Sequence, residues 1–215
     1  MKKTSAKSRA RVYGGATAAV RKASRQKAFV EAACTLIGVN GFKSLTVRSI
    51  CKEAGLTDRY FYESFGSTED LLIAVYQDVS RELEEELTKA YQEAGKSLKE
   101  QLSAVLYAYF RYMRDPRKLR IITAEVLGVS DKVTACYMQG VENFARLFHT
   151  IALADGREVE KSPENVALFG QMLLGSLTFA VVGWCESGYS QPTAEIAAFA
   201  SESLLTSIEA FYRPV

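Results

Sequence analysis

Apolar residues recur along most of the chain at intervals of three and four, the spacing of one face of an α-helix. Phe29, Ala33, Leu36 and Ile37 lie on one such face, and Gly41 follows them as a helix end. No segment shows the sustained alternation of a β-strand. The pattern therefore predicts an all-α protein with about nine helices.

A pair of short helices is predicted next. The first starts at Thr46, its N-cap residue, and ends at Gly55. Thr57 caps the second, and Leu56 and Phe61 have the spacing of a hydrophobic staple that fixes its angle of entry. Two short amphipathic helices joined by a glycine turn form the helix-turn-helix pattern.

Longer helices with one apolar stripe each follow this pair. Their predicted starts are Ser67, Ser97 with Glu100, Asp115-Pro116, Ser130, Ser162-Pro163 and Pro192-Thr193. We predict three segments in all. They are a basic flexible arm over residues 1–24, a helix-turn-helix domain over residues 25–66 and a larger helical domain over residues 67–215.

Charge divides the chain in the same way. Residues 1–66 hold 13 Lys and Arg against 4 Asp and Glu, whereas residues 67–215 hold 14 against 21. The net charge of +2 is therefore the sum of a basic first third and an acidic remainder. A basic N-terminal module on an acidic remainder is typical of a protein that binds a polyanion. A solubilising basic tail is the alternative, although Lys43, Arg48 and Arg59 lie in predicted folded structure.

Composition favours a cytoplasmic protein. With 48% hydrophobic and 24% charged residues the chain can bury a core. No apolar run reaches about 18 residues and none follows Met1-Lys2-Lys3, so we expect neither a membrane span nor a secretory leader. Four scattered cysteines (Cys34, Cys51, Cys136 and Cys185) and one histidine form no recognisable metal motif. We expect reduced thiols, no metal and no cofactor.

Residues 29–72, FVEAACTLIGVNGFKSLTVRSICKEAGLTDRYFYESFGSTEDLL, resemble the DNA-binding domain of the TetR family of bacterial transcription regulators. The shared features are the Gly41-Phe42 turn, Leu-Thr-Val over residues 45–47, Ala-Gly-Leu-Thr over residues 54–57, and Phe61-Tyr62 followed by Phe65. The resemblance implies a three-helix DNA-binding domain on an all-helical domain that binds a ligand and dimerises. This sequence departs from the family pattern at three positions. Arg59 stands where the family often has glycine, and Thr68 stands where it often has lysine. Ser64 replaces a more usual aromatic residue or histidine.

The resemblance makes the exposed side of the second short helix a DNA-recognition surface. The predicted DNA-binding residues are Thr46, Arg48, Thr57, Arg59, Tyr60, Tyr62, Ser64 and Thr68. Arg59 and Arg48 are expected at base edges, where a guanidinium matches guanine O6 and N7. Tyr62 and Thr68 are expected at phosphates, which position the protein without reading sequence. The alternative is an ordinary solvated helix in which Tyr62 packs against the first helix.

An effector cavity among the middle helices is also implied by the resemblance. The candidate effector-binding residues are Tyr107, Phe110, Met113, Met138, Asn143, Phe144, Phe148, His149, Met172, Phe179 and Trp184. Aromatic and methionine walls suit a largely apolar or aromatic ligand, but plain core packing gives the same pattern. Catalysis by His149 as a base would need a nucleophile within reach, and the nearest cysteine in sequence, Cys136, lies about 20 Å away along the same predicted helix. We therefore predict no catalytic residues and no enzyme.

The last two predicted helices are rich in small residues. The helix that starts at Ser162-Pro163 contains Gly170, Gly175, Ser176 and Gly183. By resemblance these helices pair with their symmetry mates in a homodimer, and packing within one chain is the alternative. The sequence thus predicts a ligand-responsive DNA-binding regulator, most simply a repressor released from a palindromic operator. Its partners are double-stranded DNA, a small-molecule effector and a second copy. The alternatives are an architectural or division-control factor of the same fold without an effector, and an enzyme with a helical pocket.

Overall fold

The structure is a computed structural model that describes residues 18–158 and 160–214. Its helices are α1 (Ala18–Asn40), α2 (Val47–Ala54), α3 (Asp58–Ser64), α4 (Thr68–Glu93), α5 (Leu98–Tyr112), α6 (Pro116–Thr123), α7 (Asp131–Ala154), α8 (Pro163–Glu186) and α9 (Thr193–Phe211). A short 3-10 turn, Phe42–Ser44, follows α1. The predicted all-α fold is confirmed.

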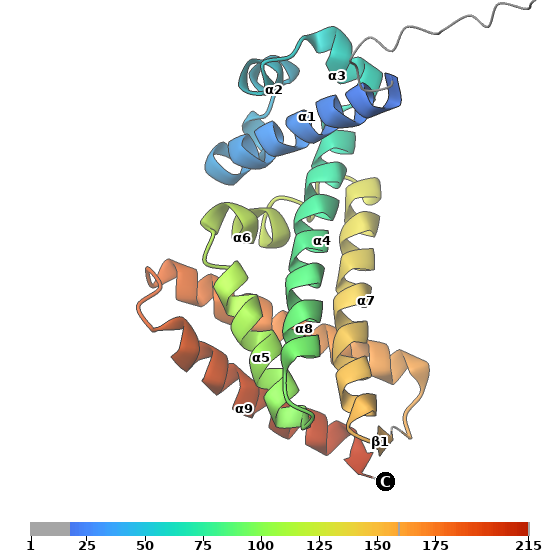
Figure 1. The fold of residues 1–215 in the computed structure, drawn as a ribbon, viewed down its shortest axis with the longest axis vertical. Coiled ribbons are helices and arrows are strands. Elements are labelled where there is room, and N and C mark those ends of the chain that lie inside the picture. Colours follow the sequence, from blue (N-terminus) through green and yellow to red (C-terminus); the bar gives the residue numbers. More distant parts are fainter. Residues whose placement is uncertain (1–17, 159, 215) are drawn as a thin grey trace, which may run out of the picture.

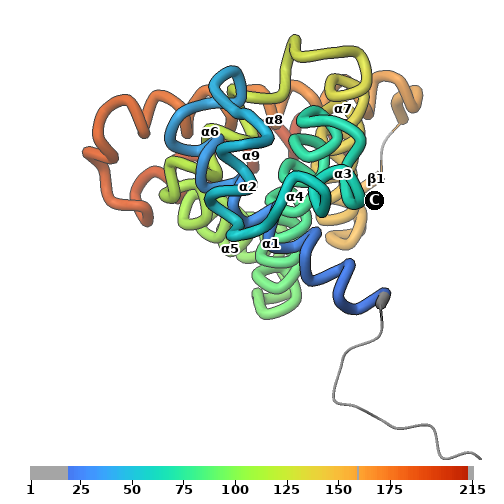
Figure 2. The backbone as a smooth tube through the Cα atoms, turned by 90° about the horizontal axis from the view of Figure 1, so that it is seen from above, coloured from blue at the N-terminus to red at the C-terminus, as the bar shows by residue number. Residues whose placement is uncertain are grey.

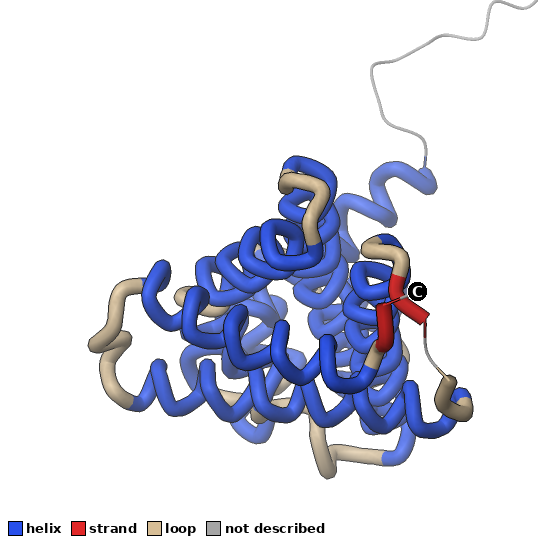
Figure 3. Tube along the Cα trace, turned by 90° about the horizontal axis from the view of Figure 1, so that it is seen from below, coloured by secondary structure: helices blue, strands red, loops and turns tan. Residues whose placement is uncertain are grey.

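A two-residue strand pair accompanies the helices. β1 (Arg157–Glu158) pairs in antiparallel fashion with β2 (Arg213–Pro214), beside the C-terminal end of the chain (Figure 3). The sequence predicts a polar loop at residues 156–160, because two residues are too few to show an alternating pattern. The pair ties the loop after α7 to the segment after α9.

The long helix α4 joins the two ends of the molecule. Helices α1, α2 and α3 lie together at one end, and α4 runs from them into the bundle formed by the remaining helices (Figure 1). Seen from above, the three N-terminal helices are grouped over the long helices (Figure 2). The 26 residues of α4 span about 39 Å at about 1.5 Å per residue. A displacement of α4 in the bundle would therefore reach the N-terminal helices.

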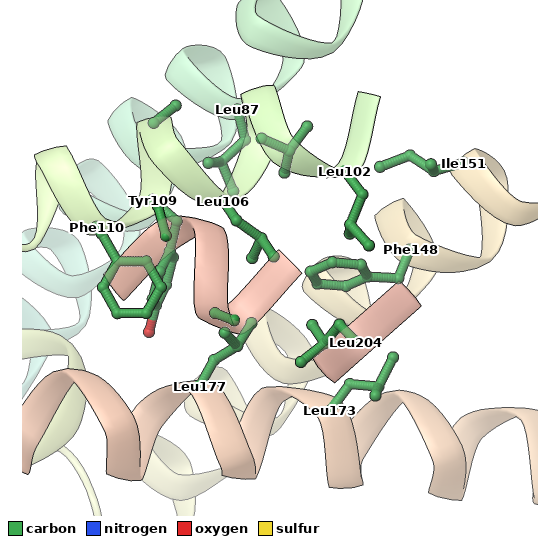
Figure 4. Close-up of a cluster of buried hydrophobic side chains, with 14 of the residues drawn as sticks. Leu87, Leu102, Leu106, Tyr109, Phe110, Phe148, Ile151, Leu173, Leu177 and Leu204 are labelled. Carbon is green, nitrogen blue, oxygen red and sulfur yellow. The ribbon is translucent and has the colours of Figure 1, made fainter. Parts of the chain in front are cut away.

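Two clusters of buried side chains form the core. The smaller one centres on Phe29 and Phe61 and includes the first half of α4. The larger one lies between α4, α5, α7, α8 and α9, where Leu106, Leu177 and Leu204 point toward one another (Figure 4). The predicted α4 stripe serves both, since residues 71–79 enter the smaller cluster and residues 83–87 enter the larger one.

Most predicted helix starts are confirmed by their caps. Ser97 and Glu100 form a reciprocal capping box, and Ser67, Ser130 and Ser162 each accept a backbone N–H through the side chain. Thr57 is different, because it occupies the N-cap position of α3 but makes no side-chain cap hydrogen bond.

The last part of the predicted arm is helical. Residues 18–24 belong to α1, and Ala18 is the first residue that the structure describes. The run of Arg21, Lys22, Ala23 and Ser24 lacks a strong apolar stripe, but it precedes Phe29 without a glycine or proline that would stop a helix from extending toward the N-terminus. Residues 1–17 of the predicted arm lie outside the described residues.

Candidate nucleic-acid interface and effector cavity

Local hydrogen bonds fix the turn between α2 and α3. Thr46 Oγ1 accepts the Ser49 N–H and the Ser49 hydroxyl accepts the Thr46 N–H, both at 3.1 Å, which closes a capping box at the start of α2. At its end Gly55 is left-handed, with φ 64° and ψ 27°, and the Leu56 N–H donates to the Cys51 carbonyl. Both ends of α2 are therefore as predicted, and together they set the direction in which α3 begins.

One face of α3 is anchored by aromatic rings. Phe61 is fully buried, and its ring centroid lies 5.6 Å from that of Phe29 and 5.9 Å from that of Phe65. Burying a phenylalanine contributes about 1.5–3 kcal/mol. A seven-residue helix is too short to be stable alone, so this packing holds α3 in place.

The opposite side of the helix-turn-helix is open to solvent and carries most of the predicted DNA-binding residues. Thr46, Arg48, Thr57, Arg59, Tyr60 and Tyr62 are exposed, whereas Ser64 and Thr68 are half-buried. Tyr62 is 63% exposed although its ring edge contacts Phe61, so it is not a core residue. The Ser64 hydroxyl donates to the Tyr60 carbonyl at 2.8 Å, which makes it less available to a ligand than predicted.

An ionic and aromatic network links α1 to the recognition surface, and the sequence did not suggest it. The Arg25 guanidinium lies 4.4 Å above the Tyr60 ring and its Nη2 is 3.7 Å from Glu63. Glu63 in turn accepts the Arg59 Nε–H at 3.0 Å. The buried Nε of Arg25 has no hydrogen-bond partner. Arg59, the predicted guanine reader, therefore has a carboxylate partner that DNA would have to displace or share.

A cavity of about 270 Å³ opens between α4 and α7 and reaches α5, α6 and α8. Its inner wall is apolar and includes the buried side chains of Leu87 and Met113 and the half-buried Phe144. Tyr109 and Thr178 also line it and bring hydroxyl groups to the wall. Pockets for small molecules are typically of this kind, mostly apolar with a few polar groups.

Tyr76 of α4 and Gly140 of α7 set the width of this cavity. The Tyr76 hydroxyl donates to the Tyr137 carbonyl at 3.4 Å, and burial raises the pKa of Tyr76 to about 12. A Cβ atom at Gly140 would collide with the Tyr76 hydroxyl. The glycine therefore allows the tyrosine to cross from α4 to α7 at this level.

Comparison with known families identifies the DNA-binding end. The family model described as bacterial regulatory proteins of the tetR family matches residues 29–75. The chain therefore carries a DNA-binding domain of the tetR family at residues 29–75. It is a TetR-type transcription regulator with a helix-turn-helix DNA-binding domain.

Solved structures share the whole fold. The chain is similar to the fatty acid degradation regulator FadR from Bacillus halodurans, with 20% identity, a TM-score of 0.71, and 88% of this chain and 97% of that chain covered. The FadR regulator from Bacillus subtilis, in complex with stearoyl-CoA, gives 20% identity, a TM-score of 0.69, and 82% and 95% coverage. A tetR-family regulator from Streptomyces coelicolor gives 16% identity, a TM-score of 0.67, and 88% and 83% coverage. A search of the curated proteins finds no match.

The predicted effector residues of this chain are scattered. Met113, Asn143 and Phe144 line the cavity. The others lie elsewhere: Tyr107 and Met138 are exposed, Met172 and Phe179 are exposed on α8, and Phe110, Phe148 and Trp184 are buried in the larger core. His149 is held by Tyr212, whose hydroxyl is 2.9 Å from the imidazole Nδ1. Sequence reasoning missed Tyr76, Tyr109 and Tyr137 as cavity residues.

A clamp connects α6 to the turn after α1. We use this name for the contacts that Arg120 and Glu125 make with Val39 and Phe42. Glu125 Oε2 accepts the Phe42 N–H at 2.7 Å, its Oε1 accepts the Arg120 Nε–H at 2.6 Å, and Arg120 Nη1 donates to the Val39 carbonyl at 3.1 Å. Gly41 makes room for it, because a Cβ there would lie 2.7 Å from Arg120 Nη2 and its φ is +80°. The clamp was not predicted from sequence.

Proposed function

We propose that this TetR-type regulator is a cytoplasmic, homodimeric repressor that leaves a palindromic operator when a small, largely apolar or aromatic effector enters the cavity between α4 and α7. The observation that carries the proposal is that the cavity and the DNA-binding domain share two helices. α4 lines the cavity with Tyr76 and Leu83 and enters the DNA-domain core with Leu71. α6 lines the cavity with Ile122, and the neighbouring Ile121 enters that same core.

Release follows from a difference in affinity between two arrangements of these helices. An effector that wedges α4 or α6 outward would move the helix-turn-helix domain, because the clamp and the shared core couple them. The effector must bind the arrangement with low DNA affinity more tightly, since equal affinity for both would shift nothing. We expect both helices to move.

Recognition would divide between base edges and phosphates. Arg59 and Arg48 are exposed and suit bidentate contacts to guanine, while Tyr60 can meet a thymine methyl group. Tyr62 and Thr68, with Thr46, Thr57 and Ser64, suit phosphate oxygens. Domain limits follow the helices, with the DNA-binding domain extending from α1 to residue 66 and the effector-binding and dimerisation domain from residue 67.

Dimerisation through α8 and α9 is supported by an exposed apolar surface. Leu168, Met172 and Phe179 on α8 and Phe199 on α9 are between 54% and 82% exposed. By length and composition α8 could cross a membrane, and 22% of its most apolar window is buried within the chain. A soluble regulator would cover such a helix with a second copy, in a two-fold interface where each surface meets itself.

The glycines of α8 have two different environments. A Cβ at Gly170 would collide with Ala145 of α7, so this glycine serves packing within the chain. A Cβ at Gly175 or Gly183 would meet no atom within 4 Å, which leaves space for a partner helix. Helix α8 therefore packs within the chain at Gly170 and leaves room for a second copy at Gly175 and Gly183.

The architectural or division-control factor remains the alternative function. A formed cavity with a mixed apolar and polar wall favours the ligand-responsive protein. The test is an operator duplex, selected from genomic DNA, titrated with full-length protein in the presence of compounds that raise its melting temperature. Loss of operator binding with such a compound supports the proposal. An operator complex that withstands every stabilising compound would favour the architectural factor.

A further inference from the structure

The rim of the cavity carries two charged side chains without an ion-pair partner. Glu84 of α4 and Arg146 of α7 both line the opening and are exposed. Neither forms an ion pair within the part of the chain that the structure describes. Their ligand preferences differ, because a guanidinium offers several donors to an anion and a carboxylate only accepts.

The α7 side of the rim is arranged as a set of donors. Glu142 precedes Arg146 by four residues, a spacing that often gives an ion pair in a helix. Here the Glu142 carboxylate accepts instead from Gln139 Nε2 at 3.4 Å, which also donates to Asn143 Oδ1 at 3.3 Å. The guanidinium of Arg146 and the carboxamide N–H groups of Asn143 are left without partners among the described residues. They lie one helical turn apart and both line the cavity.

The α4 side is less suited to bind the charged group of a ligand. Glu84 follows Arg81 by three residues, and Arg81 contacts Asp78 and Glu85 in the same stretch of helix. Because Arg81 lies nearby on the same helix, the Glu84 carboxylate should bind the amine of a ligand only weakly. The donors on α7 should bind an anionic group more strongly. Glu84 instead opposes an anionic ligand from across the opening.

The inner part of the cavity has no buried polar side-chain atom, among the described residues, that needs a hydrogen-bond partner from the ligand. Within the described residues, the buried side-chain nitrogen and oxygen atoms that lack a hydrogen-bond partner belong to Arg25 and Gln101, and neither residue lines the cavity. An apolar group can therefore enter without leaving a new unpaired polar atom. The walls that it would touch include Met113 and Phe144.

The volume indicates how much of a ligand the cavity can enclose. A space of about 270 Å³ corresponds to roughly nine molecules of water at about 30 Å³ each. A ligand of roughly ten heavy atoms therefore fills it, with part of the polar end at the rim.

We infer that the effector is an amphipathic carboxylate of roughly ten heavy atoms, whose apolar body fills the inner cavity and whose carboxylate is bound by Arg146 and Asn143 at the rim. This inference rests on the proposed function, since it names the ligand class of the same cavity.

The test compares octanoate, octanol and octylamine, which share one chain and differ in charge. Binding to the full-length protein is measured by titration calorimetry. Octanoate should bind at least about tenfold more tightly than octanol, because hydrogen bonds to charged groups are the strong ones. Arg146→Gln should remove that advantage and leave octanol binding unchanged. Glu84→Gln should strengthen octanoate binding, whereas Arg146→Gln should weaken it.

Arg111→Gln is the matched control, because Arg111 is an exposed arginine of α5 that pairs with Glu86 and does not line the cavity. It should leave all three affinities unchanged. Equal binding of octanoate and octanol, tightest binding of octylamine, no binding of any of the three, or no effect of Arg146→Gln would each overturn the inference. Operator titration of the same preparations separates the two claims. Octanoate that binds as inferred but does not release the operator contradicts the proposed function and leaves the ligand class standing.

Discussion

Replacing Glu125 with glutamine should loosen the clamp between α6 and the DNA-binding domain. The carboxylate receives the Phe42 N–H and the Arg120 Nε–H on separate oxygens, at 2.7 Å and 2.6 Å. Its side chain is 12% exposed, so water cannot readily replace either contact. Glutamine keeps the size of the side chain, but its amide NH₂ group must face one of the two donors.

The magnitude follows from the strength of the two bonds. Hydrogen bonds to charged groups contribute about 1.5–3 kcal/mol, against about 0.5–1.5 kcal/mol for neutral ones. Glu125→Gln loses one of these two hydrogen bonds and makes the acceptor of the other a neutral amide oxygen. The free energy of unfolding should therefore fall by about 2 kcal/mol. For a chain of this length that corresponds to a melting temperature lower by about 4–8 °C.

Thermal unfolding of the full-length protein measures the loss, and operator titration with and without octanoate measures the coupling. The ratio of operator dissociation constants with and without octanoate should fall toward one in Glu125→Gln, because the cavity then communicates with the DNA-binding domain through the shared core alone. Glu86→Gln is the matched control. It removes a carboxylate that pairs with Arg111 at 2.6 Å on the surface, where such pairs contribute about 0–1 kcal/mol.

The reasoning is refuted if Glu125→Gln behaves as Glu86→Gln does in both measurements. A lower melting temperature with unchanged coupling would leave the clamp as a stabilising contact and assign communication to the core that α4 and α6 share.

Three other predictions concern DNA, assembly and pH. Arg59→Ala should relax base preference at one position of each half-site by about 1–3 kcal/mol, whereas Tyr62→Phe should weaken binding to operator and random DNA alike. Titration against single-base operator variants distinguishes these two effects. A uniform loss of affinity in Arg59→Ala would make Arg59 a phosphate contact. Phe179→Glu should yield monomers by sedimentation, because it puts a charge on the exposed apolar surface of α8; an unchanged dimer would place the interface elsewhere. The hydrogen bond from Lys118 holds the pKa of Glu82 below its ordinary value, so its contribution to stability is present above that value and is lost as pH falls through the lowered pKa. Urea unfolding of Glu82→Gln between pH 6 and pH 3 (roughly the range over which carboxylates titrate) should show a shallower loss than wild type, and parallel curves would contradict the assignment.

Features of the fold that depend on neighbours in sequence could be predicted. The capping box of Ser97 and Glu100 and the left-handed Gly55 are local, since each involves residues within one helical turn. These signals mark where helices begin and end, and the resemblance over residues 29–72 adds the arrangement of the first three.

Contacts between distant segments could not be predicted in the same way. Glu125 meets Phe42 across 83 positions, and Arg25 meets Glu63 from a different helix. Helical periodicity gives the apolar face of a helix but not what covers it. Met113 and Phe179 were assigned together for this reason, although the first lines the cavity and the second is exposed on α8.

The most direct test of the regulator function is selection of bound sequences from a random duplex library by the full-length protein. A dimer with one recognition helix per protomer should enrich an inverted repeat, whose two half-sites are read on one side of the duplex about one helical turn, or a multiple of it, apart. The bound complex should contain two-fold related protomers, and Arg59→Ala should lower enrichment at one position in each half-site. Recovery of a sequence without two-fold symmetry, or no enrichment over random DNA, would contradict the account.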